Sequence, residues 1–148
     1  MVREAVAPNI ARAEALVDAF EGPTPDLLRA FFAFIADVLE TPLTGVMKLI
    51  VSESGNFPQL ARMYADLVLR RAFALMRRIL ERGIARGEFR PLDPDATVPA
   101  VIAPVLLLGV WKHSFDAHTD LTLDRRKVLE AHCENLLRGF AAETGGRS

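Results

Sequence analysis

The longest helical pattern in this chain runs from residue 56 to residue 87 and reads NFPQLARMYADLVLRRAFALMRRILERGIARG. Asn56 and Pro58 are residue types that favour the first positions of a helix, and Gly87 is a typical C-terminal stop. At 1.5 Å per residue the segment would extend about 45 Å. We therefore expect one long central helix with shorter helices packed against it. Its predicted buried face comprises Leu60, Met63, Tyr64, Leu67, Val68, Leu75, Ile79 and Leu80, which recur at three- and four-residue steps.

Five shorter helices are predicted around this segment. Thr24-Pro25, Thr41-Pro42 and Asp93-Pro94 each combine a capping residue with a proline suited to the first helical turn. The expected helices span residues 2–20, 24–40, 42–54, 94–115 and 122–142, and residues 143–148 form a frayed tail. The alternating pattern of a β-strand is absent from the sequence. The predicted fold is all-α, one domain of about six helices.

The composition bounds the class of protein. The chain has 148 residues, of which 51% are hydrophobic and 25% charged, with a formal net charge of −1. These values are typical of a globular domain without a general attraction to nucleic acid or anionic membranes. Cys133 is the single cysteine, so an internal disulfide is excluded and a cytoplasmic location is expected. The most apolar stretch, 96–111, is shorter than a membrane span and contains two prolines, so we expect no membrane insertion.

Candidate chemical groups are few. His113, Asp116, His118 and Asp120 lie close together in the sequence. The two histidines are five residues apart, whereas ligands on one helix face are usually four apart. A solvated helix end is therefore favoured over a metal site, although a metal-dependent helical enzyme remains an alternative. We expect no catalytic residues, metal or cofactor.

Eight arginines fall between Arg62 and Arg90, against three acidic residues. No aromatic residues interleave them on the same face, as a surface for single-stranded nucleic acid would require. A solvated outer face of the long helix is the favoured interpretation.

Aromatic and methionine residues come from several predicted helices at core-facing spacing. Tyr64 and Trp111 each carry a polar atom that needs a partner when buried, and adaptable methionines suit a pocket for an apolar small molecule. The sequence alone does not separate such a pocket from an ordinary core. The candidate ligand-binding residues are Phe31, Phe34, Met47, Phe57, Met63, Tyr64, Leu67, Leu107 and Trp111.

The last two predicted helices, within 93–142, are apolar on more than one side. Faces this wide can pack within the domain and also against a second copy, giving a two-fold four-helix bundle. A homodimer is therefore expected. The candidate interface residues are Val101, Val105, Leu108, Leu129, Cys133, Leu136 and Phe140.

Two stretches, SESGNFPQLARMYADLVLRR and RGIARGEFRPLDPDA, resemble the C-terminal, ligand-binding domain of TetR-type transcriptional regulators. The resemblance covers nearly the whole chain. It implies that residues 1–22 are a linking helix, that 24–55 hold two short helices, that 56–87 is the central helix, and that 93–142 is the dimerisation pair. It also implies a pocket for a small-molecule effector in a dimeric repressor.

In that family a helix-turn-helix domain precedes this one, so DNA would be bound only through a domain that is missing here. We expect a truncated chain, a processed fragment or a chain read from an internal start. The resemblance further implies that effector binding moves the linking helix and so changes the separation of the two DNA readers. A helical dimerisation module without a ligand is the main alternative.

Overall fold

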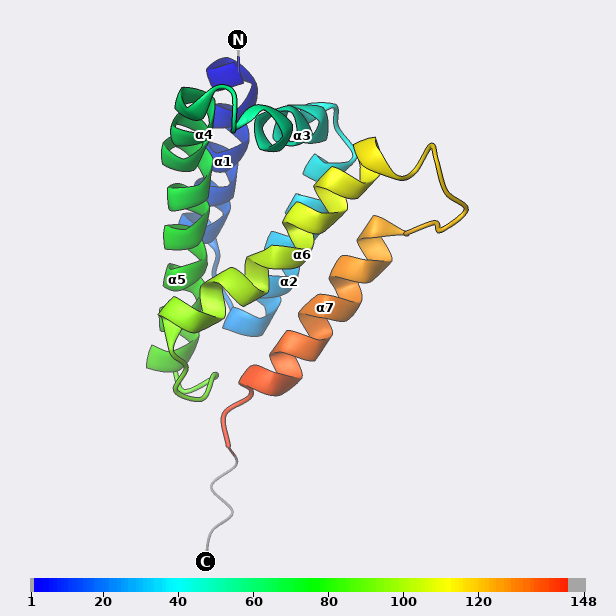
Figure 1. Ribbon diagram of the computed structural model, residues 1–148. Coiled ribbons are helices and arrows are strands. Elements are labelled where there is room, and N and C mark those ends of the chain that lie inside the picture. Colours follow the sequence, from blue (N-terminus) through cyan, green and yellow to red (C-terminus); the bar gives the residue numbers. More distant parts are fainter. Residues whose placement is uncertain (1, 144–148) are drawn as a thin grey trace, which may run out of the picture.

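The computed structural model describes residues 2–143 and shows an all-α domain (Figure 1). No strand occurs among these residues; one isolated bridge joins Phe89 to Ala141. The prediction of an all-α fold with six helices is confirmed, because α4, η1 and α5 follow one another without a break and form the single long helix. The elements are α1 (Val2–Ala19), α2 (Thr24–Leu39), α3 (Leu43–Glu53), α4 (Pro58–Tyr64), the π-helical turn η1 (Ala65–Leu69), α5 (Arg70–Ala85), α6 (Pro94–Ser114) and α7 (Arg125–Phe140). The expected frayed tail at 144–148 lies outside the described residues.

The helices form two groups. In Figure 1, α1 stands beside the long α4–η1–α5 helix, while α2, α6 and α7 run diagonally next to one another and α3 crosses at one end. The chain continues through Pro8 inside α1 and through Pro99 and Pro104 inside α6 without ending either helix.

Helix starts agree with the predictions only in part. Asp93 caps α6 as expected, because its side chain accepts a hydrogen bond from the backbone N–H of Asp95. Pro23, Pro42 and Phe57, rather than Thr24, Thr41 and Asn56, occupy the N-cap positions of α2, α3 and α4. The predictions for Thr24, Thr41 and Asn56 were therefore wrong. Helix α7 begins after the predicted start at residue 122, and Asp124 caps it by accepting a hydrogen bond from the backbone N–H of Lys127.

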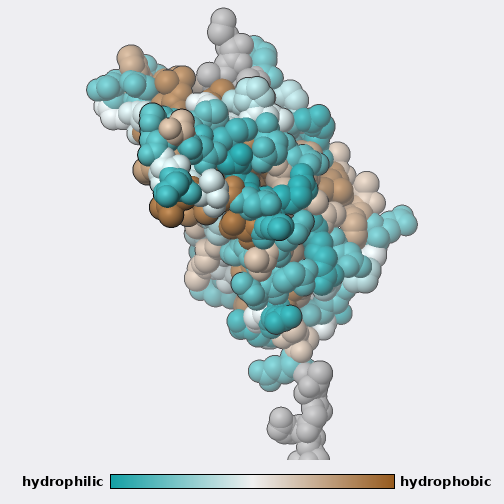
Figure 2. All heavy atoms as spheres, turned by 90° about the vertical axis from the view of Figure 1, so that its right-hand side faces the viewer, coloured by the Kyte–Doolittle hydropathy of each residue, from teal (hydrophilic) through white to brown (hydrophobic). Residues whose placement is uncertain are grey.

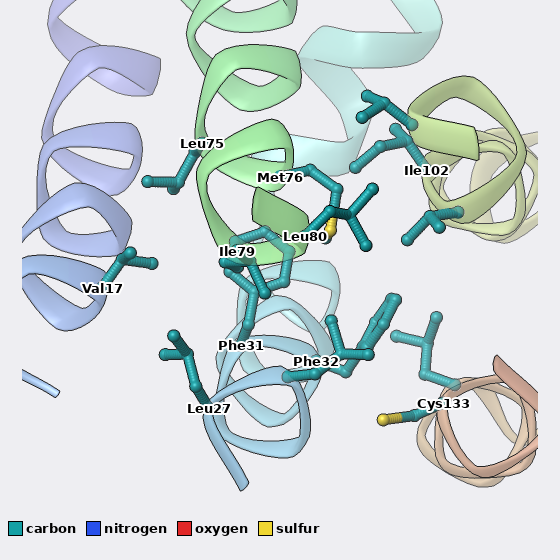
Figure 3. Packing of buried hydrophobic residues seen from close by; sticks show 14 of the residues in the cluster. Val17, Leu27, Phe31, Phe32, Leu75, Met76, Ile79, Leu80, Ile102 and Cys133 are labelled. Atoms are coloured by element: carbon teal, nitrogen blue, oxygen red, sulfur yellow. The ribbon is translucent and has the colours of Figure 1, made fainter. Parts of the chain in front are cut away.

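The main core gathers around one face of α5 (Figure 3). Met76, Ile79 and Leu80 are fully buried there. Side chains of α1, α2, α6 and α7 converge on the same centre, including Val17, Leu27, Phe31, Ile102 and Cys133. The predicted buried face of the long helix is confirmed along α5, where apolar burial of this kind is the main stabilising term.

The arginines Arg71 and Arg78 of α5, beside its buried face, are tied to α1 by ion pairs rather than left fully solvated. Arg71 bonds Glu14 through both its Nε and a terminal nitrogen, the former at 3.1 Å, and Arg78 pairs with Asp18. These cross-helix pairs use arginines that a nucleic-acid surface would need free. Each exposed pair contributes little to stability alone, but together they set how α1 lies along α5.

A second joint links the start of α2 to the end of α5. Glu88 accepts hydrogen bonds from the backbone N–H of Thr24 at 2.9 Å and from its hydroxyl at 2.6 Å. Arg82 donates to the Thr24 hydroxyl and to the Gly22 carbonyl, both at 2.7 Å. Burial alone would raise the pKa of Glu88, but the Thr24 hydrogen bonds and the charges of Arg86 and Arg82 outweigh it and lower the pKa.

We expect Gly83→Ala to lower the free energy of unfolding by about 1–3 kcal/mol, because overpacking a core has this cost. An added Cβ at Gly83 would lie 2.2 Å from a ring carbon of Phe89, which is itself buried. Gly139→Ala is the matched control, since Gly139 lies in α7 with nothing within 4 Å of the added Cβ. It should be neutral or stabilise by up to about 1 kcal/mol through helix propensity. Urea denaturation of both variants measures the difference; equal effects would contradict this packing.

We expect Glu88→Gln to lower the free energy of unfolding near pH 7 by about 1.5–3 kcal/mol, the usual value of hydrogen bonds to a charged group. Because the pKa of Glu88 is lowered by folding, its stabilising contribution is present above the ordinary glutamate pKa and is lost as pH falls through the folded-state pKa. The difference between wild type and variant should therefore shrink on acidification. Glu81→Gln, which removes a surface pair with Arg77, is the control and should change stability by under about 0.5 kcal/mol. A pH-independent difference for Glu88→Gln would contradict this assignment.

Candidate functional site

An apolar cavity of about 130 Å³ lies between α1, α2, α3, the α4–η1–α5 helix and α6. Every helix except α7 contributes to its wall. The lining residues are Val6, Asn9, Ile10, Ala13, Phe31, Phe34, Ile35, Val38, Leu39, Leu43, Thr44, Met47, Tyr64, Val68, Leu69, Ala72, Ile102, Val105 and Leu106.

The cavity separates two apolar clusters. The larger one is the main core, which reaches the wall through Ala13, Phe31, Leu39 and Ile102. The smaller one consists of Val6, Ile50 and Tyr64, with Leu43, Val46, Val68 and Leu69 packed against it. The cavity exists because these two clusters do not merge, and α1 spans both of them.

The π-helical turn η1 forms part of this wall. The N–H of Arg70 bonds the carbonyl of Ala65, five residues earlier, so this turn is wider than an α-helical one. Tyr64 directly precedes η1, and Val68 and Leu69 belong to it; all three line the cavity. Turns of this kind occur frequently at functional sites. The sequence did not predict η1, because its residues are ordinary helix formers.

Polar groups are sparse around the cavity. Among the lining residues only Asn9, Thr44 and Tyr64 have polar side chains, and none is charged. The Thr44 hydroxyl donates to the Thr41 carbonyl at 3.3 Å and lies 2.5 Å from Nε2 of His113. The Asn9 side-chain oxygen accepts from Arg12. Burial raises the pKa of the Tyr64 hydroxyl.

The cavity brings together some of the predicted ligand-binding residues and not others. Phe31, Phe34, Met47 and Tyr64 line it. Five further candidates lie outside the lining, namely Phe57, Met63, Leu67, Leu107 and Trp111. The side chains of Phe57 and Leu107 are 48% and 56% exposed. The ring of Trp111 contacts that of Phe115 at a tilt of 47°, with centroids 4.9 Å apart, and its buried indole N–H has no partner among the described residues.

Sequence reasoning missed the contribution of α1 to this wall. Val6, Ile10 and Ala13 recur at helical spacing, which predicts only that one side of α1 is buried. Whether such a side faces solid core or an empty space depends on how α3 and α4 are placed. Val105 was assigned to the dimer interface, yet it lines the cavity.

Most of the predicted interface residues are buried within this chain. Val101, Leu108, Leu129, Cys133 and Phe140 all belong to the main core. Burial raises the pKa of the Cys133 thiol to about 11. Leu136 is half-buried against the same core. These side chains therefore leave a second copy little surface to contact.

A different side of α6 is exposed and apolar. Only 28% of its most apolar 18 residues are buried. By length and composition alone the helix could cross a membrane, a property that the core helices of soluble proteins share. We name this side the outer α6 stripe; it comprises Ala96, Pro99, Ala100, Ala103 and Leu107, with half-buried Val110.

The exposed surface of α7 is different in character. Arg126, Lys127, Glu130, Glu134 and Arg138 are exposed along it. Figure 2 views the molecule from this side and shows a mainly hydrophilic surface interrupted by separate hydrophobic patches. Of the two helices α6 and α7, α6 therefore has the longer exposed apolar surface, the outer α6 stripe.

The histidine and aspartate cluster is dispersed by the fold. His113 bonds Thr44, whereas Asp116 pairs with Arg125 at 2.9 Å. Among residues 2–143, no group of three or more His, Cys, Asp or Glu side chains is placed to hold a metal ion.

A family model described as "Tetracyclin repressor-like, C-terminal domain" matches residues 21–119. The match extends from the turn after α1 to the segment that follows α6. Comparison with curated proteins and with solved structures gave no match.

Proposed function

The chain belongs to the family of tetracycline repressor-like C-terminal domains, and we propose that it is the ligand-sensing and dimerisation domain of a TetR-type transcriptional regulator. Domains of this family belong to transcriptional regulators rather than enzymes, and they typically dimerise and bind small-molecule effectors. The observation that carries the proposal is the apolar cavity, whose wall includes α1.

Cavity and α1 are arranged so that a ligand would act on one part of this helix. The Ala13–Ala19 part of α1 is held by the main core through Ala13 and Val17 and by the ion pairs of Glu14 and Asp18. Val6 and Ile10, nearer its start, border the cavity. A ligand would bind best at one particular distance between the two clusters. It would therefore favour the position of α1 that gives this distance, and the population of that position would rise.

In this proposal α1 is the linking helix, and DNA is bound by a separate N-terminal domain that reads its movement. The regulator works in the cytoplasm. Effector and DNA affinities are then coupled reciprocally, because each binding partner prefers one arrangement of the same helix.

A second copy of this chain is the proposed partner of the outer α6 stripe. The stripe is apolar, uncharged and uncovered, and exposed apolar surfaces of this kind mark interaction sites. A two-fold axis beside α6 would bring two stripes together, with α7 flanking them. This arrangement keeps the predicted dimerisation through α6 and α7 but moves the contact from the buried residues to the outer side.

We expect p-xylene, an apolar probe, to bind the wild-type domain, and Ala72→Leu to weaken this binding at least tenfold. Ala72 lines the cavity, and the larger side chain would occupy it. Ala74→Leu is the matched control, since Ala74 is exposed on the same helix. Binding should stabilise the native state by about 2.7 kcal/mol at a probe concentration 100 times the Kd. Calorimetric titration and thermal melts measure both effects; equal binding by the two variants would place the probe elsewhere.

We expect the wild-type domain to be a dimer and Leu107→Glu to shift it toward monomer, because the change places a charge in the apolar contact. Leu49→Glu is the control, since Leu49 is 51% exposed on α3, close to the 56% of Leu107. Sedimentation velocity gives the oligomeric state. A monomeric wild type, or a dimer that Leu107→Glu leaves intact, would overturn the proposed interface.

A further inference from the structure

The cavity wall restricts the charge of any ligand. No Asp, Glu, Lys or Arg side chain is among the lining residues, which are almost entirely aliphatic and aromatic. A carboxylate or an ammonium group entering this space would lose its hydration without gaining an ion-pair partner, which is strongly unfavourable. An uncharged molecule does not meet this penalty.

The cavity also restricts the size of a ligand. Its volume is about 130 Å³, and an engineered apolar cavity of roughly 150 Å³ in another protein stays dry and binds benzene. A single substituted ring is therefore the natural occupant without rearrangement of the helices.

Two polar groups at the wall have no partner among the described residues, and Tyr64 is the more deeply buried of the two. The hydroxyl of Thr44 is engaged with Thr41 and His113, whereas Asn9 is half-buried and uses only its side-chain oxygen, which accepts from Arg12, so its amide nitrogen is unpaired. Tyr64 is 9% exposed, and its hydroxyl has no hydrogen-bond partner among the described residues. Unlike the indole nitrogen of Trp111, this hydroxyl is not fully buried, so a ligand that bonds to it replaces water and gains the net value of one hydrogen bond.

We infer that the cavity takes an uncharged monocyclic molecule whose single hydroxyl or carbonyl group hydrogen-bonds to the Tyr64 hydroxyl. This inference rests on the proposed function, because it specifies the ligand class of the same cavity. Tyr64 is the last residue of α4 and directly precedes η1, whose Val68 and Leu69 also line the cavity. The apolar wall accepts the ring, and Tyr64 discriminates between rings that differ in one polar group.

A thermodynamic cycle tests this contact, with 4-methylphenol and p-xylene as probes of matched shape and with wild type and Tyr64→Phe as proteins. The hydration difference between the probes cancels when their affinity ratio is compared across the two proteins. We expect the preference for 4-methylphenol over p-xylene to fall about five- to tenfold in Tyr64→Phe, the usual value of one hydrogen bond. Calorimetric titration at pH 7 measures the four affinities, and retained p-xylene binding shows that the variant is folded.

The charge restriction is tested on the wild type alone, so that it does not depend on the variant. The anion 4-methylbenzoate should bind at least tenfold more weakly than 4-methylphenol. Equal binding of the anion would overturn the uncharged class, and an unchanged affinity ratio in Tyr64→Phe would overturn the Tyr64 contact. The neutral probes could bind in the cavity, as loss of binding in Ala72→Leu would show, without either the preference against the anion or the dependence on Tyr64. That result would leave the proposed function intact and remove the inference. Failure of all three probes to bind the wild type would overturn both.

Discussion

The buried face of α5 is the constraint on which the rest of the structure depends. Leu75, Met76, Ile79 and Leu80 lose almost all their exposure there, and α1, α2, α6 and α7 all contribute to the core around them. Because apolar burial is non-directional, it does not by itself fix how each helix lies. Polar contacts at the edge of the core do this: the ion pairs of α5 with α1 and the Glu88–Thr24–Arg82 hydrogen bonds set position where burial alone leaves freedom.

The cavity forms where this core stops. On the N-terminal side of Ala72 the long helix consists of η1 and α4. Side chains from this part join the smaller cluster around Tyr64 instead of the main core. Two clusters that share α1 and the long helix but do not fuse leave a space between them. The proposed sensing function uses this division, since a molecule filling the space contacts both clusters and the helix that joins them.

The two ends of the domain therefore have different mechanical roles in the proposal. Around Ile79 and Leu80 the packing is continuous and close, and such packing resists deformation. Around Val6 and Tyr64 the helices border an incompletely filled space. Movement of α1 is expected at this end, because fewer apolar contacts oppose it. The outer α6 stripe faces away from this space, so the proposed dimer contact and cavity lie on different sides of one helix.

Helix number, the length of the central helix and the buried face of α5 could be predicted from the sequence, because 3.6-residue periodicity and proline positions act locally. Which side of a helix is apolar is equally local, and the candidates Phe31, Phe34, Met47 and Tyr64 lie on apolar sides that line the cavity. The sequence did not distinguish the two apolar sides of α6: Val101 and Leu108 pack inside, whereas Leu107 remains exposed. That choice, the π-helical turn and the cavity itself were decided only by tertiary structure, because they depend on which neighbouring helices reach a given face and which stop short of it.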